Sequence, residues 1–263
     1  MTPSAAELLF IARNTAESSE NRIHEDSVAR HYGFRGGLVP GVTTIAYLME
    51  AALHVVGEAL LSRGQGFVRL VAPVYDGDPV TARAEPAEGG RLTLTAIGPE
   101  GQVVADGWTE LGPPAAAMAP DLPAAPLPAP AQRPPASERA FRERTVLGTL
   151  HARFDPSEAR RYLAEVGLAA SPAGLRHPGL SIRYANWVLS ANVRLGPWVH
   201  VSSAFSIYGA PAPGAEFETR ARVLDVFERR GHRFVRLDVG LFEGARPLLR
   251  VDHTAIYALR SPA

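Results

Sequence analysis

Apolar residues follow two different periods in the first half of the chain. Helical spacing runs from about Thr43 to Leu61, with Thr43 or Thr44 as the expected N-cap, and this helix is apolar around most of its circumference. The pattern then changes to strand-like segments separated by Gly- and Pro-containing turns, at 67–74, 80–84, 91–97 and 102–111. One long buried helix followed by antiparallel strands predicts a sheet wrapped around that helix.

The second half repeats this plan. Asp155-Pro156-Ser157-Glu158 places a cap, a Pro at N1 and a Glu at N3, and predicts a helix to about Val166. His177-Pro178-Gly179 then resembles Val39-Pro40-Gly41 and leads into a second apolar helix, with the two glycines 179 − 41 = 138 residues apart. Strand-like segments follow at 199–208, 216–228, 232–242 and 248–259. The repeat indicates an internal duplication whose halves pack as a pseudo-dimer.

Composition places the boundary between the halves. Residues 112–136 are almost all Pro and Ala, which predicts an extended linker between an N-terminal unit (1–111) and a C-terminal unit (137–263). At the N-terminus, residues 6–16 fit a helix or a strand. Asp26 is the expected N-cap of a short helix that stops at Gly33.

Charge and residue usage narrow the possible chemistry. Basic and acidic residues balance at 27 each, so no overall field recruits nucleic acid or an anionic membrane. Every basic residue is Arg and Cys is absent, which excludes Schiff-base lysine and thiolate catalysis. No apolar run resembles a leader or a membrane span, so a cytoplasmic location is expected. Catalysis must use His, carboxylate, hydroxyl or backbone groups.

One stretch near the N-terminus carries a specific resemblance. Asn21-x-Ile23-His24-x-Asp26-x-x-Ala29, followed by Gly33-Phe34 and Leu38-Val39-Pro40-Gly41, resembles MaoC-like hydratases and dehydratases, which include the (R)-specific enoyl-CoA hydratases. The resemblance implies an α+β double hot-dog fold, in which two antiparallel sheets each wrap around a long central helix. In that family an Asp/His pair adds water to a 2-enoyl thioester or removes it from a 3-hydroxyacyl thioester. A backbone N–H at the glycine that opens the central helix polarises the thioester carbonyl.

Carried over by position, the resemblance implies a set of site residues in this chain. The catalytic candidates are His24, Asn21 and Gly41, and the substrate-binding candidates are Ser19, Glu20, Pro40 and Val42. Three positions depart from the family pattern: Ser19 stands at the Asp, Arg22 at the Pro, and Pro40 at the His before the helix glycine. The only recognisable motif is in the N-terminal half, so the C-terminal half is expected to be non-catalytic.

The implied partner is an acyl thioester of coenzyme A or of a carrier protein. No metal, cofactor, nucleic acid or membrane partner is expected. A homodimer is compatible with the fold, because exposed hot-dog sheets and helices commonly pair. Arg35 and Arg69 are candidates to attract coenzyme A phosphates, although scattered surface arginines are the ordinary explanation.

Two other functions fit parts of the sequence. Glu50, His54 and Glu58 lie at i, i+4 and i+8 of the central helix, where a carboxylate would activate water in a hot-dog thioesterase. The simpler interpretation is a solvated or interface stripe with modest pair energies. The Ser at position 19 also fits a non-catalytic acyl-thioester binding protein. Asn186 and Asn192, on the second apolar helix, indicate either a polar patch in a cavity or an interface between the halves.

Overall fold

The computed structural model describes residues 4–113 and 122–260. Its helices are α1 (Asp26–His31), α2 (Gly41–Val56), α3 (Leu60–Arg63), α4 (Glu138–Glu143), α5 (Pro156–Glu165), α6 (Pro178–Ile182) and α7 (Tyr184–Asn192). The strands of the first half are β1 (Ala6–Ile11), β2 (Gly64–Leu70), β3 (Pro79–Pro86), β4 (Leu92–Ile97) and β5 (Val103–Leu111). Those of the second half are β6 (Val146–Arg153), β7 (Val199–Ile207), β8 (Glu216–Arg229), β9 (His232–Glu243) and β10 (Arg246–Ala258).

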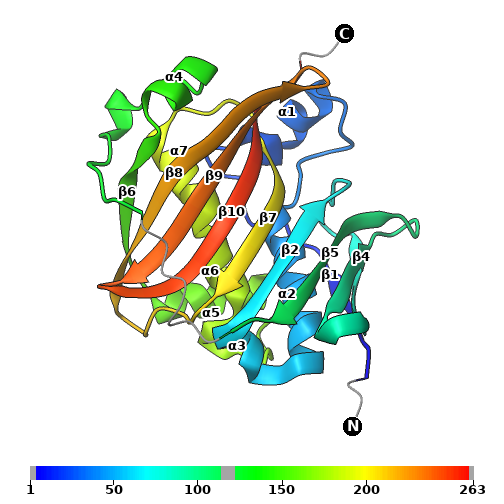
Figure 1. The fold of residues 1–263 in the computed structure, drawn as a ribbon. Coiled ribbons are helices and arrows are strands. Elements are labelled where there is room, and N and C mark those ends of the chain that lie inside the picture. The colour runs from blue at the N-terminus through cyan, green and yellow to red at the C-terminus, as the bar shows by residue number, and fades with distance from the viewer. Residues whose placement is uncertain (1–3, 114–121, 261–263) are drawn as a thin grey trace.

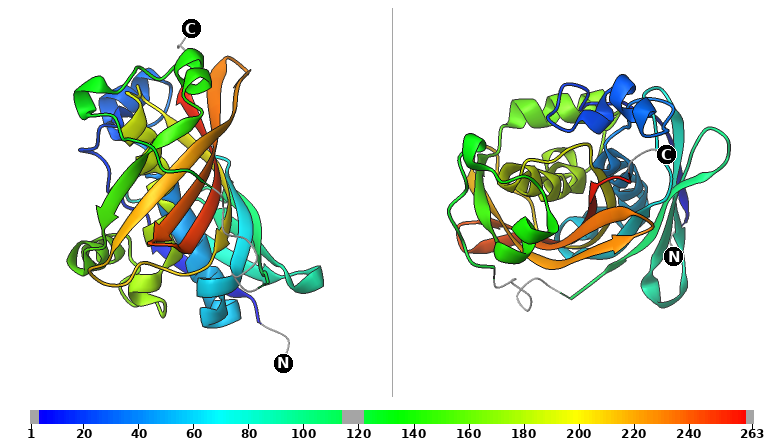
Figure 2. Two further views of the ribbon diagram at one scale, coloured as in Figure 1. Left: turned by 60° about the vertical axis from the view of Figure 1, so that its left-hand side comes forward. Right: turned by 90° about the horizontal axis from the view of Figure 1, so that it is seen from above.

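All ten strands join in one antiparallel sheet with the order β1-β3-β4-β5-β2-β7-β10-β9-β8-β6. Each half contributes five consecutive strands, and the two half-sheets meet at β2 and β7, where Phe67 faces Ala204. The sheet curls around α2, α6 and α7, which lie together on its inner side (Figures 1 and 2). This architecture confirms the predicted α+β fold, with the two expected sheets continuous through the β2–β7 pair.

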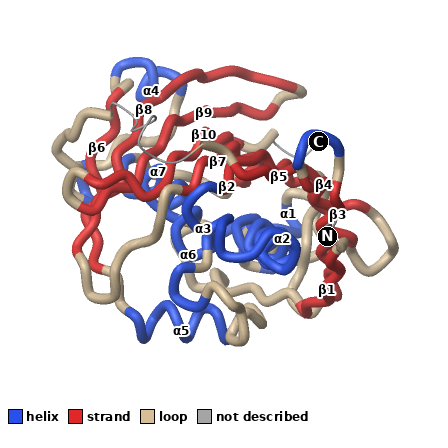
Figure 3. The backbone as a smooth tube through the Cα atoms, turned by 60° about the horizontal axis from the view of Figure 1, so that its bottom comes forward, coloured by secondary structure: helices blue, strands red, loops and turns tan. Residues whose placement is uncertain are grey.

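Helix α2 forms the centre of the molecule, as the apolar pattern predicts (Figure 3). Twelve of its residues, from Val42 to Leu53, are buried. The stretch Gly41–Arg63 is long and apolar enough to cross a membrane, but 67% of its most apolar window is buried inside the protein, as in the core helix of a soluble domain. The matching helix of the second half is divided at Arg183 into α6 and α7.

Several element boundaries differ from the sequence interpretation. Residues 6–11, which fitted a helix or a strand, form the edge strand β1 because they pair with β3. Helix α2 begins at Gly41, two residues before Thr43, so the predicted Thr caps are wrong; both threonines are buried within its first turn. By contrast, Asp155 caps α5 as predicted, accepting hydrogen bonds from Ser157 N and Glu158 N.

The described part of the linker packs against the second half. Leu122 is buried beside Gly240, and Ala125 exchanges hydrogen bonds with Thr149 of β6. Farther along, Arg133 donates to Ser190 O of α7 over 2.8 Å. The segment 122–136 therefore packs along the second half to its end, where Ala136 N donates to Arg194 O.

Candidate functional site

His24 ends a short 3-10 helix, η1 (Arg22–His24), beside the start of α2. Its Nδ1 lies 2.6 Å from the carbonyl oxygen of Leu38. Because a carbonyl only accepts hydrogen bonds, Nδ1 carries the proton of the neutral ring and Nε2 keeps its lone pair. Burial lowers the pKa of His24, and the hydrogen bond to Leu38 opposes that shift only in part. At neutral pH the site therefore holds an unprotonated Nε2, the form required of a base.

The backbone around His24 is fixed by close packing. A Cβ on Gly37 would lie 2.0 Å from the carbonyl oxygen of His24, so this position accepts only glycine. The same carbonyl accepts a hydrogen bond from Asn14 Nδ2 at 2.8 Å. Asp26 is not the N-cap of α1, which is Glu25; instead it accepts from Gly37 N at 2.8 Å and pairs with Arg30. Asp26 therefore holds the glycine turn against η1, and the predicted capping role is wrong.

Asn21 connects this site to the second half of the molecule. Its side-chain amide pairs with the backbone of Trp198: Nδ2 donates to Trp198 O at 3.0 Å, and Oδ1 accepts from Trp198 N at 3.2 Å. Oδ1 also caps η1 through Ile23 N, while Nδ2 lies 3.3 Å from His24 Nε2. Asn21 thus positions His24 and locks η1 to the segment before β7.

Gly41 brings the N-terminus of α2 to the same place. The first N–H groups of a helix have no intrahelical acceptor, and the helix dipole favours negative charge there. A Cβ on Gly41 would lie 2.1 Å from Leu70 Cδ1 and 3.5 Å from His200 Nδ1, so glycine keeps this approach open. An oxygen that gains negative charge during a reaction would be stabilised at this position.

Two cavities, each of about 510 Å³, border His24. The residues that line both are Asn21, His24, Pro40, Asn186 and Trp198. The hairpin cavity extends between the loop 70–74, the start of β7 and the β8–β9 hairpin, and includes Gly41. The helix cavity extends between the loop 15–20, α5 and α7. A substrate with two arms could therefore place its central group beside His24.

The substrate-binding candidates from the sequence all border these cavities. Ser19, Glu20 and Val42 line the helix cavity, and Pro40 lines both. Ser19 is exposed and its hydroxyl lies 3.4 Å from Asn21 O. Glu20 forms two hydrogen bonds with Arg133, at 2.8 and 3.1 Å, and these lower the pKa of its carboxyl. Ser19 supplies no carboxylate, and the carboxylate of Glu20 is engaged by Arg133.

Sequence reasoning left open the roles of Asn186 and Asn192 and missed those of Trp198 and Arg133. Asn186 lines both cavities, and its buried Oδ1 has no partner among the described residues, which makes it a cavity residue. Asn192 is different, since it bonds Gly148 and Val188 within the second half. Trp198 contacts Asn21 through its backbone N–H and carbonyl, so its residue type gave no indication of this role. Arg133 could have been singled out from the sequence, because it is the only basic residue of the 112–136 segment.

Glu50 lies in the contact between the halves, away from both cavities. Ser171 Oγ donates to Glu50 Oε2 at 2.6 Å, and His54 Nε2 lies 3.3 Å from Oε1. His177 Nε2 lies 3.4 Å from Oε2, an ion-pair distance without hydrogen-bond alignment. Burial acts to raise the pKa of Glu50, but these neighbours outweigh it and lower the pKa. Glu50 is 5% exposed and bonds Ser171 of the second half, so of the two simpler interpretations the interface holds for this residue and the solvated surface does not.

The pseudo-equivalent position in the second half is closed. His177 Nδ1 accepts from Gly179 N at 3.1 Å, and a Cβ on Gly179 would lie 2.6 Å from Ala46 Cβ. A turn histidine therefore occupies the helix start that Gly41 leaves open in the first half. This asymmetry fits a single site in the N-terminal half.

Two histidines of the second half pack against each other beside the site, with their ring planes tilted by 43°. His200 and His253 have ring centroids 4.4 Å apart, and His200 Nε2 lies 2.9 Å from Ser203 Oγ. Burial lowers the pKa of His200 to about 4 and places the pKa of His253 well below its usual value. Both rings are neutral at physiological pH. In the described parts of the chain, no group of three or more His, Asp or Glu side chains is placed to hold a metal ion.

Comparisons with known proteins identify the fold. No protein-family model and no curated protein sequence matches the chain. A Chloroflexus aurantiacus protein, provisionally assigned as a MaoC domain dehydratase, aligns with a TM-score of 0.60 and 11% identity over 99% of this chain and 96% of its own. A Mycobacterium tuberculosis protein described as having a double hot-dog fold aligns with a TM-score of 0.58 and 14% identity, over 97% of this chain and 96% of its own. The dehydratase domain of PpsC from the same organism was solved in complex with C12:1-CoA. It aligns with a TM-score of 0.53 and 13% identity, over 97% of this chain and 94% of its own.

Structures provisionally assigned as thioesterases also match, at TM-scores of 0.50 and 0.51. Identities at this level establish the fold and leave the reaction to be argued from the site. The chain has the double hot-dog fold and is similar in structure to MaoC-like dehydratases.

Proposed function

We propose that the protein interconverts 2-enoyl and 3-hydroxyacyl thioesters of coenzyme A or of a carrier protein, as a hydratase or dehydratase. The observation that carries this proposal is the unprotonated Nε2 of His24, held by Leu38 and Asn21 beside the helix start at Gly41. A base and an N–H donor for a developing enolate oxygen are the two groups that this reaction needs.

His24 would serve as the proton-transfer group in both steps. In dehydration, Nε2 takes the α-proton while the Gly41 N–H stabilises the enolate oxygen. The protonated ring then gives that proton to the departing β-hydroxyl, which leaves as water. Hydration is the reverse. One ring with two roles fits a site in which Ser19 replaces the family Asp and Glu20 is bound to Arg133.

The position of Glu50 supports this reaction over thioester hydrolysis. A hot-dog thioesterase of the kind considered above would use a carboxylate of α2 to activate water. Glu50 lines neither cavity and contacts Ser171 and His54.

The test follows the conjugated enoyl-thioester absorbance on mixing purified protein with a panel of 2-enoyl-CoAs. We expect the band to disappear with wild type, and His24→Ala to lose about 10²- to 10⁴-fold in rate, the usual contribution of a general acid–base. His31→Ala is the matched control, because His31 lies on the exposed end of α1. Release of free thiol would instead indicate a thioesterase, and the absence of Cys removes any protein background from that assay. Tight binding without turnover would indicate a binding protein.

A further inference from the structure

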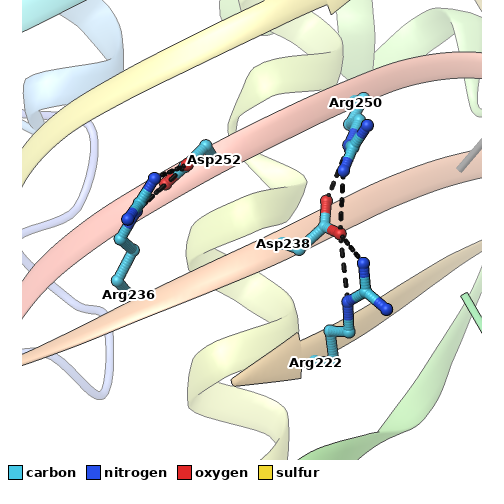
Figure 4. A network of polar contacts seen from close by, with 5 residues as sticks. All are labelled: Arg222, Arg236, Asp238, Arg250 and Asp252. Carbon is cyan, nitrogen blue, oxygen red and sulfur yellow. Dashed lines mark hydrogen bonds and ion pairs between the residues drawn. The ribbon is translucent and has the colours of Figure 1, made fainter. Parts of the chain in front are cut away.

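The arginines that the sequence offered for phosphate binding are already neutralised. Arg35 pairs with Asp78 at 2.5 Å and lies over the Tyr75 ring, and Arg69 pairs with Asp106 at 2.6 Å. Arginines on the outer face of the second half are paired as well. Figure 4 shows Arg222 and Arg250 on Asp238, and Arg236 on Asp252.

Two adjacent arginines of the β8–β9 turn are different. Arg229 and Arg230 are exposed, have no partner among the described residues, and line the hairpin cavity. The nearest acid on the same hairpin, Glu228, lies 3.8 Å from Arg233. The turn lies close to the C-terminal end of the described chain, where the stem of Arg260 packs on Gly231 (Figure 1). His232 Nδ1 accepts from Arg260 N at 3.0 Å, so the neutral ring carries its proton on Nε2.

Arg230 has a positive φ, a backbone conformation that is unfavourable for a residue with a side chain. Arg230 and Gly231 form a two-residue hairpin turn with φ of 53° and 78°, values for which Asn-Gly is the usual pair. Arg230 is the one non-glycine residue with positive φ within residues 4–113 and 122–260. An arginine in a conformation that costs stability indicates a use for its side chain.

The two cavities also differ in charge. The residues lining the hairpin cavity include Arg229 and Arg230 and no Asp or Glu. Those lining the helix cavity include Arg161 and Arg183 against Glu20, Glu158 and Glu165. An anionic group would therefore enter by the hairpin cavity.

We infer that the β8–β9 turn is a phosphate site for the carrier end of the thioester. Arg229 and Arg230 bind a phosphate of coenzyme A or of phosphopantetheine, and the carrier arm lies in the hairpin cavity with the thioester beside His24 and Gly41. This inference rests on the proposed acyl-thioester function, but it concerns binding and does not depend on which reaction follows.

The experiment measures equilibrium binding of three probes by calorimetry: coenzyme A, 4′-phosphopantetheine and pantetheine, which has no phosphate. The test variant is Arg229→Gln with Arg230→Asn; Asn suits the turn, so thermal stability should be equal to or above that of wild type. The control variant is Arg144→Gln with Arg160→Gln, which removes the same charge from exposed arginines that line neither cavity.

We expect the test variant to bind coenzyme A at least about tenfold more weakly, with pantetheine unchanged and the control like wild type. Added salt should weaken coenzyme A binding to wild type more than to the test variant. An equal loss for phosphopantetheine places the contact on the phosphate next to pantetheine, whereas a loss confined to coenzyme A places it on the nucleotide phosphates. Unchanged coenzyme A affinity in the folded test variant, or an equal loss for pantetheine, would overturn the inference. Since no probe carries an acyl group, failure of the hydratase assay leaves this result interpretable.

Discussion

His24 differs from an ordinary surface histidine in the direction of its pKa shift. Burial lowers the pKa below the usual 6.5, so the ring loses its proton more easily and the basic form persists at lower pH. We therefore expect the acid limb of kcat/KM against pH to lie below 6.5 for an enoyl- or 3-hydroxyacyl-CoA substrate. An acid limb at or above 6.5 would mean that a different group takes the proton.

Asn21→Asp sharpens the same prediction, because it places a carboxylate at the position now 3.3 Å from His24 Nε2. A nearby negative charge favours the protonated ring, so the acid limb should move to higher pH than in wild type. Asn21→Ala, which removes the amide and adds no charge, should leave the limb lower than Asn21→Asp does. If the two variants titrate alike, Asn21 does not act on His24 through Nε2.

At the scale of elements, α2 serves the site with its N-terminus and the contact between halves with its middle. Glu50→Ala would leave Ser171 and His177 without their carboxylate in a buried contact, which should cost about 2–4 kcal/mol of unfolding free energy. Denaturant unfolding measures this loss, and turnover of enoyl-CoA by the folded variant should stay near the wild-type rate. Abolished turnover with unchanged stability would return Glu50 to the catalytic candidates.

The elements also separate what local sequence predicts from what it does not. The start of α5 was predictable from Asp155 and Pro156, because an N-cap and a proline at the first helical position act on the first turn alone. Glu50 could not be placed from its helical spacing, because its partner Ser171 is 121 residues away. For the same reason the pairing of Asn21 with Trp198, 177 residues distant, left no trace in the motif. His24 and Gly41 were found because both belong to one short contiguous stretch.

For the whole molecule, the decisive feature is the junction of the halves. The β2–β7 pair joins two half-sheets into one sheet. It also brings His200 of β7, and Trp198 just before that strand, to a site whose base comes from the first half. The duplication was readable from the repeat, but the choice of edge strands was not, because strand pairing depends on contacts distant in sequence. The predicted homodimer and cytoplasmic location stay predictions.

The histidine pair on β7 and β10 links this junction to the stability of the whole fold. Because the pKa of folded His200 is about 4 and that of an unfolded histidine is 6.5, the unfolded chain binds more protons between these values. The contribution of His200 to stability is therefore fully present above pH 6.5 and is lost as the pH falls toward 4. His200 alone accounts for a loss of about 2 kcal/mol between pH 7.5 and 5.

The variant His253→Leu removes two buried ring nitrogens that have no partner among the described residues. The unfolding free energy of this variant should therefore fall less between pH 7.5 and 5 than that of wild type. Denaturant unfolding at the two pH values, with exposed His31→Leu as the control, measures the difference. Equal losses in wild type and His253→Leu would mean that His253 adds nothing to the acid sensitivity of the fold.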